Sequence, residues 1–286
     1  MPTIERAGAR TQLKELAMKK LASLPPFSPI LNRLMSSLAD ENVSFLELGD
    51  LIEKDTVIAG NVLRLVNSAL YSRRGTVNSV RRAVSLLGLA KLRNIVMSMS
   101  VSRLWASQKW PAGWNSSQFN LHAVAAAIMA DLLATELPTD YPEGAFAAGL
   151  LENVGMLLVA ASLPDDFIRV RDYYLGNSSN TLTTSEREVL GFDHADLSGE
   201  VLDVWNLPKP IRQAVAEHHF PRTGSLGAVV SAADTLVEQL GISAQPWHRP
   251  PSGAPEETLQ ALNLGDNSAG LIEAFRAEYD GLKSFF

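Results

Sequence analysis

Apolar residues recur along this chain at the spacing of an α-helix. In residues 56–69, for example, Ile58, Val62, Leu65 and Val66 fall at i, i+4, i+7 and i+8 and form a stripe along one face. No segment alternates between apolar and polar residues for long enough to indicate a β-sheet. The pattern therefore predicts an all-α protein.

Polar, glycine and proline positions mark where these helices begin and end. Ser44 followed by Glu47 has the spacing of a capping box, Asp55 can cap the next helix, and Gly88 supplies a left-handed stop. Helices are expected over 4–22, 30–38, 45–54, 56–69, 79–87, 89–105, 118–137, 142–160, 163–177, 208–219 and 225–241. Two more are expected in 185–208, broken at 191–193, and two after residue 258.

Two segments rich in turn-forming residues divide this pattern. Residues 110–117 (WPAGWNSS) have the composition of a connection, and residues 244–257 carry four prolines and are expected to form an exposed loop. We expect an N-terminal helical bundle (1–110) and a second helical lobe (111–245). The proline-rich loop and the C-terminal helices (246–286) would then pack back on both.

The composition limits the class of protein. The chain has 286 residues, of which 46% are hydrophobic, so it can bury a core. It lacks both an uninterrupted apolar run of membrane-spanning length and the apolar centre of a signal peptide, so we expect a cytoplasmic protein without membrane contact. Cysteine is absent, so any metal ligands must come from His, Asp and Glu.

Charge is unevenly distributed along the chain. The net charge is −6, yet residues 56–130 contain no Asp or Glu. Within this stretch Arg73, Arg74, Arg81 and Arg82 flank a turn at Gly75, where guanidinium groups suit an anionic partner. Alternatively, these arginines form a solvated face and pair with acids elsewhere in the chain. The pI of 5.4 and the lack of a recognisable motif do not favour nucleic acid.

Histidines dominate any metal argument in a chain without cysteine. His122 lies one step off an apolar stripe and is expected to point inward, where a histidine is most often hydrogen-bonded core. His194 begins a helix, and His218 and His219 end one, where their positive charge can act as a C-terminal cap. His248 lies in the proline-rich loop and is expected to be solvated.

Three further polar residues occupy positions expected to be buried. Asn153 lies on the apolar face of its predicted helix and must therefore be hydrogen-bonded. Glu152 neighbours small residues that let another helix approach, and Asp234 stands inside an apolar helix, where it needs a partner. Together with His122, these residues predict a polar cluster between helices.

Other catalytic signatures are absent from the sequence. It has no P-loop, no G-x-S-x-G elbow and no HExxH motif. Asn67 and Ser68 resemble a catalytic pair, but their place at a helix end favours a structural role in binding unpaired carbonyl groups.

Several blocks of the chain, in order, resemble the HDOD family, the HD-related output domains of bacterial signalling proteins. The resemblance covers roughly residues 15–240. The matching blocks are LPPFSPILNRLMSSLADENVSFLELGDLIEKDTVIAGNVLRLVNSALYS, RRAVSLLGLAKLRNIVMSMSV, GAFAAGLLENVGMLLV, GFDHADLSGEVLDVWNLP and AVAEHH.

This resemblance implies an N-terminal helical bundle packed on a lobe built like an HD hydrolase. In catalytic HD enzymes a first His, a His-Asp pair and a later Asp hold the metal. His122 matches the first of these and Asp234 the last, but Glu152 and Asn153 occupy the pair. His194, His218 and His219 resemble the additional histidines of two-metal relatives that cleave cyclic dinucleotides.

The missing His-Asp pair decides the expected chemistry. A hydrolytic centre needs anionic oxygen to hold its dication, and Asn supplies only a neutral carbonyl. We therefore expect no catalytic residues, no resident metal and no cofactor.

Three functions remain open at this point. The favoured one is a non-catalytic signalling module that binds a protein partner, or a nucleotide or other anionic ligand. The alternatives are an HD phosphohydrolase or phosphodiesterase with a rearranged site, and a regulator that binds nucleic acid through the face formed by Arg73, Arg74, Arg81 and Arg82.

Overall fold

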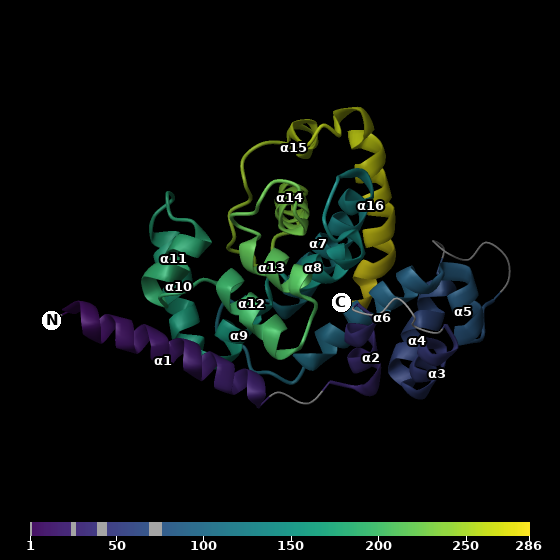
Figure 1. The fold of residues 1–286 in the computed structure, drawn as a ribbon, viewed down its shortest axis with the longest axis horizontal. Coiled ribbons are helices and arrows are strands. Elements are labelled where there is room, and N and C mark those ends of the chain that lie inside the picture. Colours follow the sequence, from purple (N-terminus) through teal and green to yellow (C-terminus); the bar gives the residue numbers. More distant parts are fainter. Residues whose placement is uncertain (1, 24–26, 39–44, 69–75) are drawn as a thin grey trace.

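The computed structural model describes residues 2–23, 27–38, 45–68 and 76–286, and within these residues it contains helices and no β-strand. The predicted all-α class is therefore confirmed. Two groups of helices lie side by side, a smaller one formed by α2–α6 and a larger one formed by α7–α14 (Figure 1).

The smaller group follows the predicted elements closely. Its helices are α2 (Pro29–Ser37), α3 (Phe45–Lys54), α4 (Thr56–Val66), α5 (Val80–Leu87) and α6 (Leu89–Leu104). The carboxylate of Asp55 caps α4 by accepting hydrogen bonds from the amides of Val57 and Ile58 at 3.1 and 3.0 Å. Gly88, with a φ of 79°, ends α5 as expected, because only glycine adopts this backbone angle without strain.

Two smaller predictions for this group have different outcomes. Asn67 binds backbone groups as expected, donating to the carbonyls of Leu63 and Val77 and accepting from the Val77 amide. The predicted capping box at Ser44 and Glu47 falls partly outside the described residues, because Ser44 is not among them. Glu47 forms an ion pair with Arg33 at 2.8 Å.

The larger group surrounds two mostly buried helices, α7 and α8. It consists of α7 (Ser116–Glu136), the 3-10 turn η1 (Pro142–Gly144), α8 (Ala145–Leu151), α9 (Val154–Ser162), α10 (Pro164–Gly176), α11 (Leu182–Val189), α12 (His194–Val204), α13 (Lys209–Glu217) and α14 (Leu226–Gln239). A Cβ atom added at Gly149 would lie 2.7 Å from the Ala126 carbonyl, so glycine is what allows α7 and α8 to touch along their backbones.

The prediction of one continuous helix over 142–160 is wrong in one respect. The helix is interrupted at Glu152 and Asn153, between α8 and α9. After the break, the Gly155 amide donates to the hydroxyl of Ser198 on α12 at 2.8 Å. The contact with α12 thus provides a hydrogen-bond acceptor for a backbone N–H group that has no partner within its own helix at the break. The segment Pro142–Ser162 is long and apolar enough to cross a membrane, but 94% of its most apolar window is buried inside the protein.

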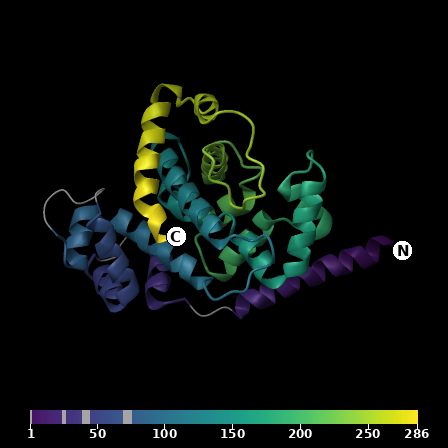
Figure 2. The same ribbon diagram turned by 180° about the vertical axis from the view of Figure 1, so that it is seen from behind.

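Helix α1 (Pro2–Ala22) lies along α9 and α12 of the larger group (Figure 2). Ala17 of this helix is fully buried, and Lys14 forms an ion pair with Glu200 of α12. The first helix therefore belongs spatially with the second lobe, although the sequence boundary near residue 110 assigned it to the first.

The C-terminal elements return to both groups of helices. They are α15 (Pro255–Ala261), η2 (Gly265–Asn267), α16 (Ser268–Leu282) and η3 (Lys283–Phe285). Helix α16 packs on α7 and buries Phe275, while its Glu278 pairs with Lys91 of α6 at 3.1 Å. Arg64 of α4 stacks over the ring of Phe285 at 4.4 Å. The chain end thus bridges the two groups.

Candidate functional site

A cavity of about 270 Å³ opens in the larger group of helices. Residues from α9, α12 and α14 form its floor, and the loops after α10 and α14 form its rim. Its lining is Asn153, Met156, Tyr174, Ser178, Asn180, Thr181, Leu182, His194, His219, Asp234, Glu238, Ala244, His248 and Arg249. Two polar clusters meet at this cavity, one around His122 and one around His194.

The His122 cluster contains all four residues of the expected degenerate centre. His122 is fully buried on α7, and its Nδ1–H donates to the Ile242 carbonyl at 2.8 Å. Its Nε2 lies 3.2 Å from an Asp234 carboxylate oxygen and 3.5 Å from one of Glu152. The imidazole is therefore held from both sides.

Asn153 and Glu152 close the cluster from the break between α8 and α9. The Asn153 amide nitrogen lies 3.3 Å from His122 Nε2 and donates to Glu152 Oε1 at 3.4 Å. Both side chains belong to residues that are almost inaccessible, with exposed fractions of 8% for Asn153 and 1% for Glu152. Within the described part of the chain, Glu152 Oε2 has no hydrogen-bond partner.

The electrostatics of this cluster distribute charge unevenly. Burial lowers the pKa of His122, but its contacts with Asp234 and Glu152 outweigh burial and hold that pKa well above 6.5. Burial opposes ionisation of Asp234 too, yet its hydrogen bond to His122 keeps the pKa of this carboxyl far below its usual value. Burial, together with the charge of Asp234, raises the pKa of Glu152 from 4.5 to about 8. At neutral pH the cluster therefore holds one cation, one anion and one neutral acid.

These residues do not fit the metal centre of an HD hydrolase. Such a centre needs neutral imidazole nitrogen and several carboxylate oxygens around one point. Here the contacts of His122 with Asp234 and Glu152 hold its pKa well above 6.5 and so favour the charged ring, and Asn153 presents an amide where the resemblance implies an aspartate. His122, Asp234 and Glu238 also have ligand atoms within 4.8 Å of one another. This trio does not fit a metal centre either, because His122 and Asp234 already pair with each other.

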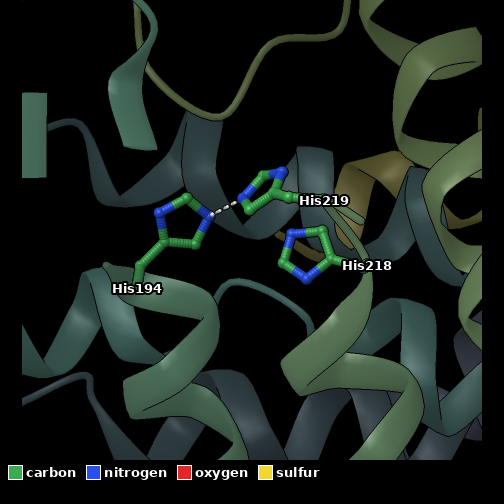
Figure 3. Close-up of side chains that lie close together, drawn as sticks. All are labelled: His194, His218 and His219. Atoms are coloured by element: carbon green, nitrogen blue, oxygen red, sulfur yellow. Dashed lines mark hydrogen bonds between the residues drawn. The ribbon is translucent and has the colours of Figure 1, made fainter. Parts of the chain in front are cut away.

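The second cluster brings together three further histidines, two of them buried and one half-buried. His194 comes from the first turn of α12, and the adjacent His218 and His219 follow α13, so that the three rings face one another (Figure 3). His194 Nε2 and His219 Nε2 lie 2.9 Å apart. One ligand nitrogen from each of the three residues lies within 4.8 Å of the other two.

Two of these rings are oriented by a hydrogen bond that their Nδ1–H group donates to a buried acceptor. His194 Nδ1–H donates to a Glu186 carboxylate oxygen at 2.7 Å, and that oxygen also accepts the His194 backbone amide at 3.0 Å. His218 Nδ1–H donates to the Val215 carbonyl at 2.7 Å at the end of α13. Both Nε2 atoms are thereby turned into the cluster. Within the described residues, buried His218 Nε2 has no hydrogen-bond partner.

The pKa values of the three histidines diverge. Burial lowers the pKa of His218 to about 4, and burial together with the neighbouring histidines lowers that of His219 to about 2. For His194 burial also favours the neutral form, but the charge of Glu186 and its hydrogen bond raise the pKa above 6.5. His218 and His219 are thus neutral at physiological pH.

Several residues around the cavity were not identified from the sequence. Glu186 is 3% exposed and holds His194 from behind, but its helix carries no pattern that distinguishes it from an ordinary surface glutamate. Arg249 donates to the carbonyls of Tyr174 and Asn180, at 2.6 and 3.2 Å, and so ties the proline-rich loop to the loop after α10.

The expectation that His248 is solvated is wrong. Its side chain is only 9% exposed, and Nδ1 lies 3.4 Å from a Glu238 carboxylate oxygen. The proline-rich segment folds over the cavity and is held there by Arg249, so it covers a residue that its composition suggested was exposed.

The basic surface proposed for an anionic partner is only partly described. Arg81 is 64% exposed on its side chain and pairs with Asp50 at 3.3 Å, and Arg103 pairs with Asp55. These contacts agree with the alternative in which arginines of the acid-free stretch pair with acids elsewhere. Arg82 lies in the first turn of α5 next to Arg81, while Arg73 and Arg74 lie outside the described residues.

The described residues form an all-helical fold in which His122, Glu152, Asn153 and Asp234 lie together beside a cluster of three histidines. The pattern of the HDOD domain matches residues 24–221, and the chain belongs to the HDOD family. It is also 23% identical over 224 residues to an uncharacterized protein of Treponema pallidum, and it spans about two fifths of the length of that relative.

Solved structures share this fold at low sequence identity. An HDOD domain protein of unknown function from Geobacter sulfurreducens has a TM-score of 0.76 and 23% identity, with 95% of this chain and 98% of that one covered. A "Putative signal transduction protein" from Marinobacter aquaeolei VT8 has a TM-score of 0.74 and 20% identity, covering 96% and 66%. A "Putative phosphohydrolase" from Shewanella amazonensis SB2B has a TM-score of 0.72 and 22% identity, covering 94% and 97%.

Proposed function

We propose that this chain is a non-catalytic signal-transduction module that uses an HD-hydrolase scaffold to bind a partner protein. The observation that carries the proposal is the His122 cluster. Asp234, Asn153 and Glu152 all lie within 3.5 Å of His122 Nε2 or of one another, where a hydrolase would hold its dication. Polar groups of the protein itself take the place of the ion.

The names given to proteins of similar fold agree in part with this proposal. A related fold occurs in a protein called a signal transduction protein and in another called a phosphohydrolase. The shared fold alone does not distinguish binding from hydrolysis, so the residues of the site must be used to distinguish them. A hydrolase needs a water activated beside a metal, and the His122 cluster offers a hydrogen-bonded imidazolium instead.

A turnover assay tests the absence of catalysis. Full-length protein would be incubated with cyclic dinucleotides and with bis(p-nitrophenyl) phosphate, in the presence of Mn²⁺, Fe²⁺ or Zn²⁺. We expect no hydrolysis above that of the His122→Gln variant. Turnover by the parent that disappears in both His122→Gln and Asp234→Asn would establish a hydrolase with a rearranged site and overturn the proposal.

Restoring the missing pair tests the location of the degenerate centre. Glu152→His combined with Asn153→Asp supplies an imidazole and a carboxylate beside His122 and Asp234, so it should increase metal affinity there. The measurement is best made in a His219→Gln background, where the second histidine cluster does not contribute. A double variant that binds metal no better than its background would show that these residues do not occupy the metal position.

A further inference from the structure

The three-histidine cluster leaves two polar features unexplained. His218 Nε2 is buried, and no described residue lies within hydrogen-bonding distance of it. His194 Nε2 and His219 Nε2 face each other at 2.9 Å, which is favourable only if a proton or a cation stands between them. A buried polar atom without a partner costs about 1 to 3 kcal/mol, so this arrangement calls for a bound species.

We propose that His194, His218 and His219 bind a divalent transition-metal ion of the class that prefers imidazole nitrogen, with Zn²⁺ as its representative. One cation placed between the three rings would accept the lone pairs of all three Nε2 atoms. It would satisfy His218 and replace the proton that the other two rings share. No residue of the missing His-Asp pair takes part.

The geometry is close to what such an ion requires. Zinc–nitrogen bonds of about 2.0 to 2.1 Å in a tetrahedral site place ligand nitrogens about 3.3 Å apart. The ligand nitrogens of the cluster already lie within 4.8 Å of one another, and the closest pair must open by only a few tenths of an ångström.

The surroundings of the cluster resemble those of a metal site. Each ligating histidine usually donates its other ring nitrogen to a carboxylate or carbonyl, which fixes the ring and makes it a stronger ligand. Glu186 does this for His194, and the Val215 carbonyl does it for His218. His194 and His219 also line the cavity, so an ion can enter from that side.

Calorimetry on tag-free, chelator-stripped, full-length protein tests the proposal with Zn²⁺ alone. We expect one ion per chain and an increase in melting temperature upon its addition. His219→Gln and His218→Gln should each weaken binding at least tenfold. With Co²⁺ as the probe, the parent should show the visible absorption of a four- or five-coordinate site, and His219→Gln should lose it.

Two control variants separate this site from its neighbours. His248→Gln alters the only histidine outside both clusters and should bind Zn²⁺ like the parent. Glu238→Gln alters the competing trio with His122 and Asp234 and should also have no effect. No saturable binding by the parent, retention of binding by both cluster variants, or loss of binding in Glu238→Gln would each overturn the proposal.

A variant that keeps the shape of the site guards against simple misfolding. Glu186→Gln retains an oxygen that can accept from His194 but removes the negative charge behind it. Loss of such a partner typically lowers metal affinity by about tenfold or more, and we expect the melting temperature of the metal-free protein to change little. Equal affinity in Glu186→Gln and the parent would show that His194 is not a ligand.

Discussion

The His122 cluster and the three-histidine cluster meet at one cavity but satisfy their polar atoms in opposite ways. In the first, side chains of the protein itself surround His122 Nε2, with Asp234, Asn153 and Glu152 at 3.2, 3.3 and 3.5 Å. In the second, His194 and His218 are each held through Nδ1. Nε2 of His194 faces Nε2 of His219, and Nε2 of His218 has no hydrogen-bond partner among the described residues. One cluster is closed by the protein, and the other is open to a ligand.

Taken together, our two proposals describe a scaffold that has lost a hydrolytic centre and keeps metal-binding groups elsewhere. The expectation that the chain holds no metal was based on the residues at the position of the His-Asp pair. The second cluster lies on α12 and after α13, where that replacement does not reach. If the comparison is correct, changes in the His122 cluster cost folding stability, whereas changes in the three-histidine cluster cost metal binding.

The largest expected effect is that of Asp234→Ala. Removing the carboxylate leaves the buried imidazolium of His122 without its main counter-charge, so the free energy of unfolding should fall by about 3 kcal/mol at neutral pH. Urea denaturation in the presence of EDTA measures this. Asp203→Ala is a matched control, because its 66% exposed carboxylate contacts Arg212 at the surface and should matter by less than about 1 kcal/mol.

Asn153→Leu should have the next largest effect. The leucine would fill the space of the amide but could not donate to Glu152, whose Oε1 would keep only its 3.5 Å contact with His122 Nε2. The expected loss of stability is about 2 kcal/mol, measured from thermal and urea unfolding without metal. An unchanged melting temperature would show that the amide is not part of a stabilising network.

Glu152→Gln should stabilise the protein, and increasingly so at higher pH. The unfolded chain releases the Glu152 proton near pH 4.5, but the folded protein retains it until about pH 8. The parent therefore loses stability as the pH rises through this range, and the glutamine variant does not. At pH 8 the variant should be more stable by at least about 1.4 kcal/mol, the equivalent of one pKa unit. Equal pH profiles of unfolding would contradict the raised pKa.

The smallest effect is expected for His219→Gln in metal-free protein. Its half-buried ring contributes one hydrogen bond to His194, so the variant should lose less than about 1 kcal/mol of stability. Unfolding curves in EDTA and in Zn²⁺ should diverge for the parent and coincide for the variant. A loss comparable to that of Asp234→Ala would mean that both clusters serve the fold and that the comparison fails.

Much of the fold could be predicted because its signals are local. The stripe along Ile58, Val62 and Leu65 is buried as expected, Asp55 caps α4, and Gly88 ends α5. Each of these depends on residues within a few positions, whose spacing follows directly from helix geometry. The break at Glu152 and Asn153 could not be predicted this way, since the apolar pattern continues through it and a contact with α12 stabilises it.

The site shows the same division. The inward position of His122 followed from its helix. The buried positions of Glu152, Asn153 and Asp234 predicted their grouping with it, and the resemblance matched the four to metal-ligand positions. The role of Glu186 and the burial of His248 depend on segments that meet only when α11, α12 and the proline-rich loop close over the cavity. No spacing along the chain encodes those contacts.

The amino-acid sequence by itself determined the helices, most of their ends, and the replacement of a charged metal ligand by an amide. These follow from local backbone preference and from the chemistry of single side chains. Only the tertiary structure decided which polar groups pair and which remain open, because pairing depends on the directions in which distant helices aim their side chains. That is why side chains of the protein surround His122 while, among the described residues, His218 Nε2 has no hydrogen-bond partner.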